Sequence, residues 1–356
     1  MQNYLSWVPT VSPPPLNLSN PKARLLTASP NHAQIQIRTE KTFEYRYYDS
    51  DGDISSLAEV KFPLPSHVKS ITSTSNPFVK HCVKLRHSSS YRHFHGSALV
   101  VGTTPIREIH KFQKSLEERT VETECLILLD KAKVPEGLDS SSSRTLRVSA
   151  LVMKKLSQLQ STESIEAIAL MKFPTSYFVV DDHENNADCW KWFPTPHRIL
   201  VLEGIQDPGN LGTLIRSAVA FRWGGIFILP GCCDPFNDKA LKASRGASFQ
   251  VPIVSGSWRH LEALKDEFQM KMLAGQPASD DELKPVAELS QGLADSLADT
   301  PLCLVLGSEG HGLSEKSMRE CQLISIPMAR NYESLNVAVA GGIFLYMLQP
   351  KNQRIP

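Results

Sequence analysis

The sequence has no long hydrophobic run, no paired-cysteine motif and no large net charge, and each absence excludes a class of protein. Its 356 residues carry 38 Lys and Arg against 37 Asp and Glu, so the net charge of +1 indicates no particular partner. The longest apolar run, Val337 to Leu348, is well short of the ~20 residues that cross a bilayer. The seven cysteines include no C-x-x-C pair, which argues against a zinc site or a disulfide framework. We therefore expect a soluble protein of a reducing compartment, with no membrane or metal partner.

Acidic residues are missing from the first 39 positions, which instead contain six prolines and seven Ser or Thr. The charged side chains there are Lys22, Arg24 and Arg38. An acid-free, hydroxyl-rich and weakly basic segment is typical of organellar transit peptides, and it lacks the apolar core of a secretory signal. Few arginines and many prolines favour a chloroplast over a mitochondrion, with an ordinary disordered tail as the alternative. We expect residues 1–72 to be a transit peptide and a disordered linker.

A second acid-free stretch, from Val60 to Arg107, is rich in basic side chains and histidines. Such a local excess of positive charge attracts polyanions and adds affinity for phosphates. Tyr91 and Phe94 lie among these residues and can stack on unpaired bases. A solvated helix face is the alternative. The candidate RNA contacts are Lys80, Lys84, Arg86 and Arg92.

The segment that follows alternates between strand and helix patterns. Short β-branched or apolar runs predict strands over 97–101, 125–129 and 165–171, and apolar residues at helical spacing predict helices over 106–118 and 148–159. This alternation predicts a small α/β domain at 73–180. A polar stretch at 181–197, which ends near two prolines, predicts a hinge to a second domain at 198–356.

The second domain contains three glycine-rich corners. The first follows a predicted strand over 199–202, and the apolar spacing after it predicts a helix that begins near Asn210, whose side chain can cap it. Arg216 is rotated off the apolar stripe of this helix and is expected to point away from the core. The second corner, Gly307 to Gly312, follows a predicted strand over 302–306. It matches neither a dinucleotide fingerprint nor a phosphate-binding loop nor a nucleophile elbow.

The third corner follows a strand that ends at Pro327, and a helix of small residues then runs to Leu348. Ser334 and Asn336 stand where this helix starts. Their side chains suit either helix capping or a clamp on a small ligand, and the sequence alone leaves both interpretations open.

In order, the three corners have the patterns N-x-G-x-x-x-R-S-A, L-G-S-E-G-x-G-L and I-P-M…S-L-N-V-A-V-A. Together they resemble the three motifs of the SpoU (TrmH-like) RNA ribose methyltransferases, over about Arg198 to Leu348. The resemblance implies an α/β fold in which a parallel-sheet domain with a deep trefoil knot follows a small RNA-binding α/β domain. It also implies a homodimer whose active site is shared across the two-fold interface.

The resemblance implies S-adenosylmethionine as the cofactor and assigns residues to it by position. The expected cofactor contacts are Leu306, Gly307, Gly310, Ile326, Met328 and Leu335. The expected catalytic residues are Asn210, Arg216, Glu309, Ser334 and Asn336. Lys239, Lys242 and Arg245 are spaced three apart and are further candidate RNA contacts, with plain surface residues as the alternative. His311 departs from the family pattern, and we assign it no catalytic role.

The function implied is 2′-O-ribose methylation of RNA, and the basic first domain favours ribosomal over transfer RNA. The expected target is a guanosine of organellar large-subunit ribosomal RNA. One alternative is a transfer-RNA methyltransferase with the same chemistry. The other is an RNA-binding ribosome-assembly factor that has lost turnover.

Overall fold

The structure is a computed structural model of the whole chain. It describes residues 68–138, 144–159, 167–180, 188–277, 285–329 and 334–350, and the backbone of three earlier strands. The chain divides into two compact units, Met1–Leu64 and Pro65–Pro356. In the first unit, β1 (Ala23–Leu26), β2 (Gln34–Thr39) and β3 (Thr42–Tyr47) form an antiparallel sheet, which the sequence pattern did not predict. The rest of the predicted transit peptide lies outside the described residues.

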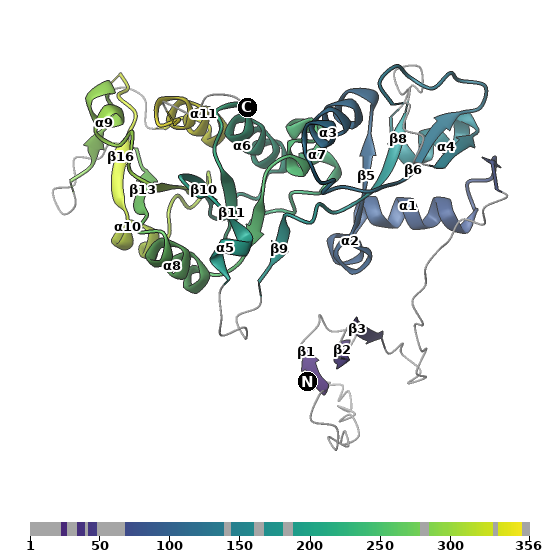
Figure 1. The fold of residues 1–356 in the computed structure, drawn as a ribbon, viewed down its shortest axis with the longest axis horizontal. Coiled ribbons are helices and arrows are strands. Elements are labelled where there is room, and N and C mark those ends of the chain that lie inside the picture. Colours follow the sequence, from purple (N-terminus) through teal and green to yellow (C-terminus); the bar gives the residue numbers. More distant parts are fainter. Residues whose placement is uncertain are drawn as a thin grey trace, which may run out of the picture. The chain divides into compact units, whose positions relative to one another are not determined.

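The second unit contains a sheet of eight parallel strands in the order β14-β16-β13-β15-β10-β11-β12-β9 (Figure 1). Its strands are β9 (Tyr177–Val179), β10 (Arg198–Leu202), β11 (Gly225–Ile228), β12 (Ile253–Ser255), β13 (Lys271–Gly275), β14 (Ala287–Glu288), β15 (Leu302–Leu306) and β16 (Gln322–Ser325). The predicted strands at 199–202 and 302–306 are confirmed, and the sheet has the expected parallel α/β class.

Helices cover both faces of this sheet and make it the middle of three layers. They are α5 (Cys189–Trp192), α6 (Pro208–Ala220), α7 (Asp238–Ser244), α8 (Trp258–Glu267), α9 (Gln291–Ser296), α10 (Glu315–Glu320) and α11 (Val337–Met347), with a 3-10 helix η1 (Ala247–Phe249). Side chains alternate along β10, as the pleat of a strand requires. Leu200 and Leu202 pack with α6, α9 and α11, whereas Ile199 and Val201 pack with α5 and α8.

A smaller sheet of five strands has the order β4-β7-β6-β8-β5 and mixes parallel with antiparallel pairs. Its strands are β4 (Ser70–Ile71), β5 (Ser97–Val101), β6 (Thr123–Leu129), β7 (Arg144–Val148) and β8 (Ile168–Lys172). Its helices are α1 (Pro77–His87), α2 (Ser89–His95), α3 (Thr103–Ser115) and α4 (Ala150–Ser157). The predicted strands and helices are confirmed to within a few residues, but β4 begins before the expected boundary at residue 73.

The expected hinge at 181–197 is wrong where the structure describes it. Residues 188–197 include α5, and Trp192 and Phe193 are buried in the core under the larger sheet. Strand β9 precedes this segment and pairs with β12 of the larger sheet, although the expected boundary assigned it to the small domain. The segment is therefore part of the folded core, and residues 181–187 lie outside the described residues.

An apolar cluster joins the smaller sheet to the segment between β11 and β12 of the larger one. Phe236, Leu241 and Phe249, which belong to the segment between β11 and β12, are buried among side chains of β5, β6, β8 and α3. Phe236 stacks on Phe173, the residue after β8, with ring centroids 4.2 Å apart. An apolar cluster of this kind fixes the smaller sheet against the larger one.

Within the described residues, no helix is both long and apolar enough to cross a membrane. The same part of the chain holds no group of three or more His, Cys, Asp or Glu side chains placed to bind a metal ion. All seven cysteines are described, and none of them forms a disulfide.

Candidate active site

A cavity of about 480 Å³ lies at the carboxyl edge of the larger sheet, where ligands bind in open parallel sheets. Its walls come from the ends of β13 and β15, from the segments after β13, β15 and β16, and from α11. These segments meet because β13 lies between β15 and β16 in the sheet. The second and third glycine-rich corners of the sequence therefore form a single site.

The loop after β15 folds back on itself. The Ser308 amide donates to the Gly312 carbonyl at 3.0 Å, and the Gly312 amide donates to the Ser308 carbonyl at 2.9 Å. A Cβ atom on Gly307 would collide with the Gly312 carbonyl oxygen. Closure of the loop itself therefore requires glycine at position 307.

Glu203, directly after β10, fixes the far end of this loop. Its carboxylate accepts hydrogen bonds from the amide and hydroxyl of Ser314, at 3.0 and 2.8 Å, and from the hydroxyl of Ser317 at 2.6 Å. Burial raises the pKa of Glu203, but these bonds and one from the Trp258 indole outweigh burial and lower it below its ordinary value. Sequence reasoning missed this residue, because its partners lie more than 50 positions away.

Three of the five residues predicted to be catalytic form one hydrogen-bonded cluster. The side-chain amides of Asn210 and Asn336 both donate to Oε1 of Glu309, the latter at 3.0 Å. The Asn336 amide also donates to Oδ1 of Asn210 at 3.2 Å. These residues come from the first turn of α6, the loop after β15 and the start of α11. The Asn210–Glu309–Asn336 cluster thus joins all three corners at the edge of the cavity.

Helix capping explains how the two asparagines take their places. Asn336 is the N-cap of α11, since its Oδ1 accepts from the amides of Ala338 and Val339. Its Nδ2 donates to the other members of the cluster, so Asn336 both caps the helix and takes part in the site. Asn210 is not a cap, contrary to expectation: α6 begins at Pro208, and Asp207 caps it by accepting from the Asn210 amide at 2.8 Å. The side chain of Asn210 therefore remains available to Glu309.

Arg216 and Ser334 stand apart from the cluster. Ser334 is exposed and lines the cavity. Arg216 lies on α6 six residues after Asn210 and is exposed between the buried Ile215 and Ala218, as the helical spacing predicts. It does not line the cavity, and no side chain in the described part of the chain pairs with its guanidinium. The Arg216 guanidinium is therefore exposed to solvent outside the cavity.

Of the residues predicted to bind a cofactor, Leu306, Gly307, Ile326, Met328 and Leu335 line the cavity. Gly310 does not, because it lies at the exposed tip of the folded-back loop.

Sequence reasoning missed Gly275, Gln276 and Phe344, which also line the cavity. Gly275 ends β13 and Gln276 follows it, neither within a motif, and only the strand order brings them to the site. The cavity combines apolar walls with backbone-rich corners, and its volume is typical of ligand sites. Size and lining both fit S-adenosylmethionine, a nucleoside joined to an amino acid.

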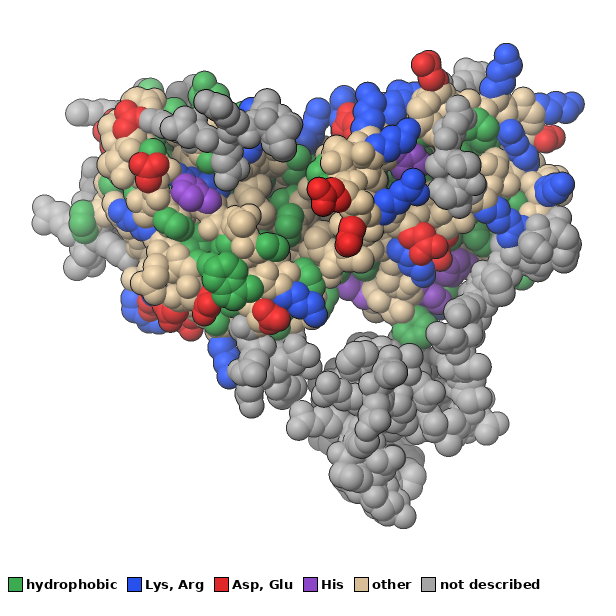
Figure 2. All heavy atoms as spheres, viewed as in Figure 1, with side chains coloured by type: hydrophobic (Ala, Val, Ile, Leu, Met, Phe, Trp, Pro, Cys, Tyr) green, Lys and Arg blue, Asp and Glu red, His purple; other side chains and the backbone are tan. Residues whose placement is uncertain are grey.

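Five of the seven predicted RNA contacts are exposed: Lys80, Lys84, Lys239, Lys242 and Arg245. Lys84 lies 4.4 Å from the Tyr91 ring centroid, and Lys242 forms an ion pair with Asp238 at 3.1 Å. On the face seen in Figure 2, Lys and Arg side chains (blue) gather over α3 and α7. The role of these five side chains as RNA contacts stays a prediction.

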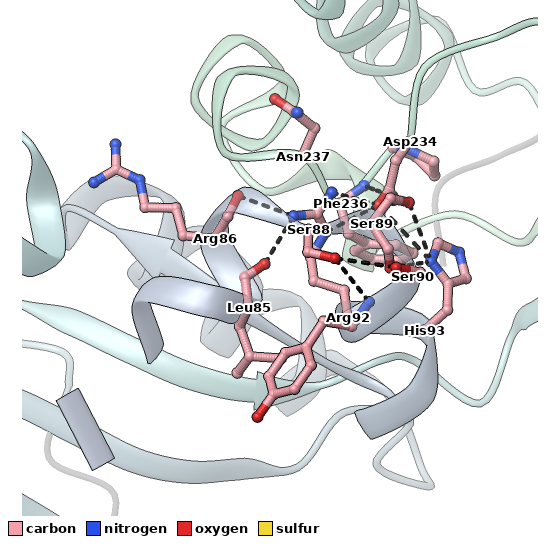
Figure 3. Close-up of polar contacts among 12 residues, drawn as sticks. Leu85, Arg86, Ser88, Ser89, Ser90, Arg92, His93, Asp234, Phe236 and Asn237 are labelled. Carbon is pink, nitrogen blue, oxygen red and sulfur yellow. Dashed lines mark hydrogen bonds and ion pairs between the residues drawn. The ribbon is translucent and has the colours of Figure 1, made fainter. Parts of the chain in front are cut away.

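Arg86 and Arg92 contradict their predicted role as RNA contacts. Both are buried, and Arg92 is only 2% exposed. Arg86 pairs with Asp238 at 2.8 Å and donates to the Leu156 carbonyl. Arg92 reaches Asp234 with two guanidinium nitrogens, as Figure 3 shows. Their charges serve to join α1 and α2 to the segment that contains α7, and they are not available to an RNA.

Comparison with known proteins gives a consistent result. Residues 197–346 match the model of the SpoU rRNA Methylase family. An uncharacterized tRNA/rRNA methyltransferase of Synechocystis is 31% identical over 292 residues, which cover 80% of this chain and 95% of that protein. The 23S rRNA (guanosine(2553)-2′-O)-methyltransferase of Bacillus subtilis is 27% identical over 283 residues, which cover 79% of this chain and all of that protein.

The fold has solved counterparts as well. An S-adenosylmethionine-bound rRNA methyltransferase from Sinorhizobium meliloti superposes with a TM-score of 0.61 at 21% identity, over 79% of this chain and 97% of that one. The family match, the full-length relatives and the shared fold agree with the three sequence motifs and with the cavity they surround. The chain therefore belongs to the SpoU (TrmH-like) class of RNA 2′-O-methyltransferases, whose cofactor is S-adenosylmethionine.

Proposed function

We propose that this protein methylates the ribose 2′-hydroxyl of a guanosine in organellar large-subunit ribosomal RNA. The observation that carries the reaction is the Asn210–Glu309–Asn336 cluster at the edge of the cofactor cavity. Three segments distant in the sequence place two amides and a carboxylate together beside a site of cofactor size. Such a fixed polar group orients a second substrate next to the first.

Residues of this chain have different roles in the reaction. The sulfonium of bound S-adenosylmethionine supplies an activated methyl group, so the protein needs to align the acceptor oxygen and exclude water. Arg216 stabilises the negative charge that develops on the ribose oxygen and anchors a neighbouring phosphate. A guanidinium does not readily give up its proton, so we assign Arg216 an electrostatic role. Ser334 and Asn336 hold the ribose.

Two features support an rRNA substrate. The relative from Bacillus subtilis is named for a guanosine of 23S rRNA, and the match covers that protein completely. The exposed Lys80, Lys84, Lys239, Lys242 and Arg245 give this chain a basic surface suited to phosphates. A transfer-RNA substrate and a ribosome-assembly role without turnover are the competing functions.

We further infer a homodimer, together with the knotted threading that the resemblance implies. The support is an exposed apolar face on α11, where Val339 is 53% and Tyr346 is 57% exposed. Large apolar side chains of this kind are typical of an interface. Helix α11 packs against α6, which carries the exposed Arg216, so a two-fold contact here would bring Arg216 to the partner's site. Light scattering of the purified protein tests this, and a monomer at micromolar concentration would contradict it.

The reaction is tested by methyl transfer from labelled S-adenosylmethionine into separate pools of unmodified ribosomal and transfer RNA. The RNA is then digested to nucleosides. We expect a 2′-O-methylated guanosine from the ribosomal pool alone. Label in transfer RNA only would contradict the proposed rRNA substrate. No label in either pool or in ribosomal particles would contradict the proposed methyltransferase activity.

The proposed location is tested separately. Residues 1–72, fused to a fluorescent protein, are expected to carry it into chloroplasts. Fluorescence in mitochondria would contradict the chloroplast location, and diffuse cytosolic fluorescence would contradict the prediction of a transit peptide.

A further inference from the structure

A second cavity, of about 520 Å³, lies in the smaller-sheet part of the molecule and has no role in the reaction described above. Its walls come from the second half of α3, the loop that leads into β6 and the residues after β8. We propose that this cavity binds one unpaired nucleotide of the RNA substrate. The proposal rests on the proposed function, because it assumes that the protein acts on RNA.

The charge of the lining suits a phosphate. Lys114 and Arg119 are exposed at the cavity, and Lys172 lies in its wall. Lys172 is already paired with Glu124 at 3.2 Å, and the lining contains one carboxylate, that of Glu122. The lining therefore holds three cations, Lys114, Arg119 and Lys172, and a single carboxylate. A phosphate group placed here gains charge-assisted hydrogen bonds.

The same cavity offers an aromatic ring to a base. His110 lines it, and Nε2 of His110 lies 3.1 Å from the hydroxyl of Thr123, which holds the ring in place. Phe173 adds an apolar wall, since its own ring is stacked on Phe236. Burial, together with Lys114 and Arg119 nearby, lowers the pKa of His110, so its ring is neutral at pH 7. A neutral ring beside cations matches the two parts of a nucleotide, since bases stack on aromatic side chains while phosphates pair with Lys and Arg.

Hydrogen bonds within the fold hold the wall of the cavity in place. Gln113 is buried, and its Oε1 accepts from the amides of Thr120 and Val121 at 2.8 and 3.1 Å. The Nε2 of Gln113 donates to the Thr120 hydroxyl at 2.9 Å. These three bonds fix the loop that carries Arg119 against α3. A loop fixed in this way avoids the entropic cost of being ordered on binding.

An unpaired nucleotide fits better than duplex RNA. A volume of this size is within the range of sites for single small ligands. Bases inside a duplex are stacked and cannot enter a side pocket, whereas loops and bulges present bases that can. The cavity would therefore add selectivity for unpaired RNA to the general attraction of the basic surface.

The test compares two double variants of equal charge change in the full chain. Lys114→Ala with Arg119→Ala removes two exposed cations of the cavity, and Lys133→Ala with Lys154→Ala removes two exposed cations of the smaller-sheet part that lie neither in its lining nor on α3. Binding of a single-stranded RNA is measured by fluorescence anisotropy from 0.05 to 0.3 M salt. Two lost phosphate contacts are expected to flatten the slope of log K against log salt by about 1.4 and to weaken binding roughly 25-fold at 0.1 M salt. The control pair should change neither by more than a small fraction of this.

A third variant separates a pocket from a charged surface. Thr123→Trp fills the cavity without changing its charge, and a thermal melt checks that it folds. We expect this variant to lose the preference for single-stranded over double-stranded RNA and to keep its salt slope. Equal losses of RNA affinity in the two double variants would contradict a nucleotide site in this cavity, and so would an unchanged strand preference in Thr123→Trp. Methyl transfer by the wild-type protein would in either case still support the proposed function. Wild-type protein that neither binds nor methylates RNA would overturn both.

Discussion

Nη2 of Arg92 lies 2.6 Å from Oδ2 of Asp234, although 142 residues separate the two in the sequence. Arg92 also donates to the carbonyls of Leu85 and Arg86, and Asp234 accepts from the hydroxyl of Ser89. The pair is almost fully buried, with side chains 2% and 7% exposed. It therefore joins the helices of the smaller sheet to the loop that follows β11.

Replacing Asp234 by Asn is expected to destabilise the protein strongly. The asparagine oxygen can still accept from the Phe236 amide, but it leaves the Arg92 charge buried without a counter-ion. Removing one partner of a buried ion pair costs about 3–5 kcal/mol. Urea unfolding measures this free energy. Glu124→Gln removes the partner of the partly exposed Lys172 and serves as the control, with an expected cost of about 1 kcal/mol or less. Equal losses in both variants would contradict the role of burial.

Gly307→Ala is expected to abolish tight cofactor binding, and Gly310→Ala is not. A Cβ atom at Gly307 meets the backbone of Gly312 and opens the folded-back loop, whereas a Cβ at Gly310 has no atom within 4 Å. Titration calorimetry with S-adenosylmethionine should show a loss of roughly tenfold or more, about 1.4 kcal/mol, for Gly307→Ala. The larger Gly307→Val should lose more. Similar affinities for the Gly307 and Gly310 variants would show that the loop does not shape the cofactor site.

Glu309→Ala removes the acceptor that Asn210 and Asn336 share. Without it the two amides lose their fixed orientation, and a small misplacement in an active site costs roughly 100-fold in rate. We expect kcat for methyl transfer to fall by about this factor while the protein remains folded. Glu315→Ala, an exposed carboxylate in the first turn of α10, is the matched control and should keep its rate. Normal turnover in Glu309→Ala would exclude the cluster from the reaction.

Arg216→Ala is expected to stop methyl transfer and to leave cofactor binding intact. Arg216 is exposed and does not line the cavity, so neither the core nor the cofactor depends on it. The loss of one electrostatic group at a developing negative charge costs roughly 10²–10³ in kcat. Single-turnover methylation and cofactor calorimetry on the same preparation measure the two effects. Arg319→Ala, on the exposed side of α10, controls for the loss of a surface charge. Retained turnover would remove Arg216 from the mechanism.

His81 makes the stability of the protein depend on pH. Burial, with His95 and Lys172 nearby, lowers the pKa of His81 to about 4. An unfolded histidine titrates near pH 6.5, so the unfolded chain takes up this proton first as the pH falls. The stability that depends on a neutral His81 is complete above pH ~6.5 and is lost as the pH falls toward 4. The difference in unfolding free energy between wild type and His81→Gln should shrink by up to roughly 1.4 kcal/mol per pH unit in this range. A constant difference would contradict the shift.

Much of the fold could be predicted from local patterns. Leu302–Leu306 is a continuous apolar run before a glycine, and it forms a buried central strand. The start of α6 was misplaced because two capping residues, Asp207 and Asn210, stand close together. The proline at 208 decides between them, since proline suits the first turn of a helix and leaves Asp207 as the cap.

Long-range partners limited what could be predicted of the site. Arg92 has no acidic neighbour in the sequence, so its charge seemed free for RNA, and only the fold brings Asp234 to it. Gly275 and Phe344 line the cofactor cavity without belonging to any motif, because the strand order places β13 between β15 and β16. Asn210, Glu309 and Asn336 could be predicted because the resemblance to the SpoU family assigns catalytic residues to these motif positions.

The apolar cluster around Phe173 and Phe236 holds the smaller sheet at a fixed distance from the larger sheet. A tethered domain adapts to RNAs of many shapes, whereas parts held by one apolar cluster keep the same separation in every encounter. An RNA gripped at the smaller sheet would therefore reach the cofactor cavity only if its own folded structure matches that separation. Substrate selection by this enzyme would then depend on the three-dimensional form of the RNA, and an unfolded strand with the same local sequence would be a poor substrate.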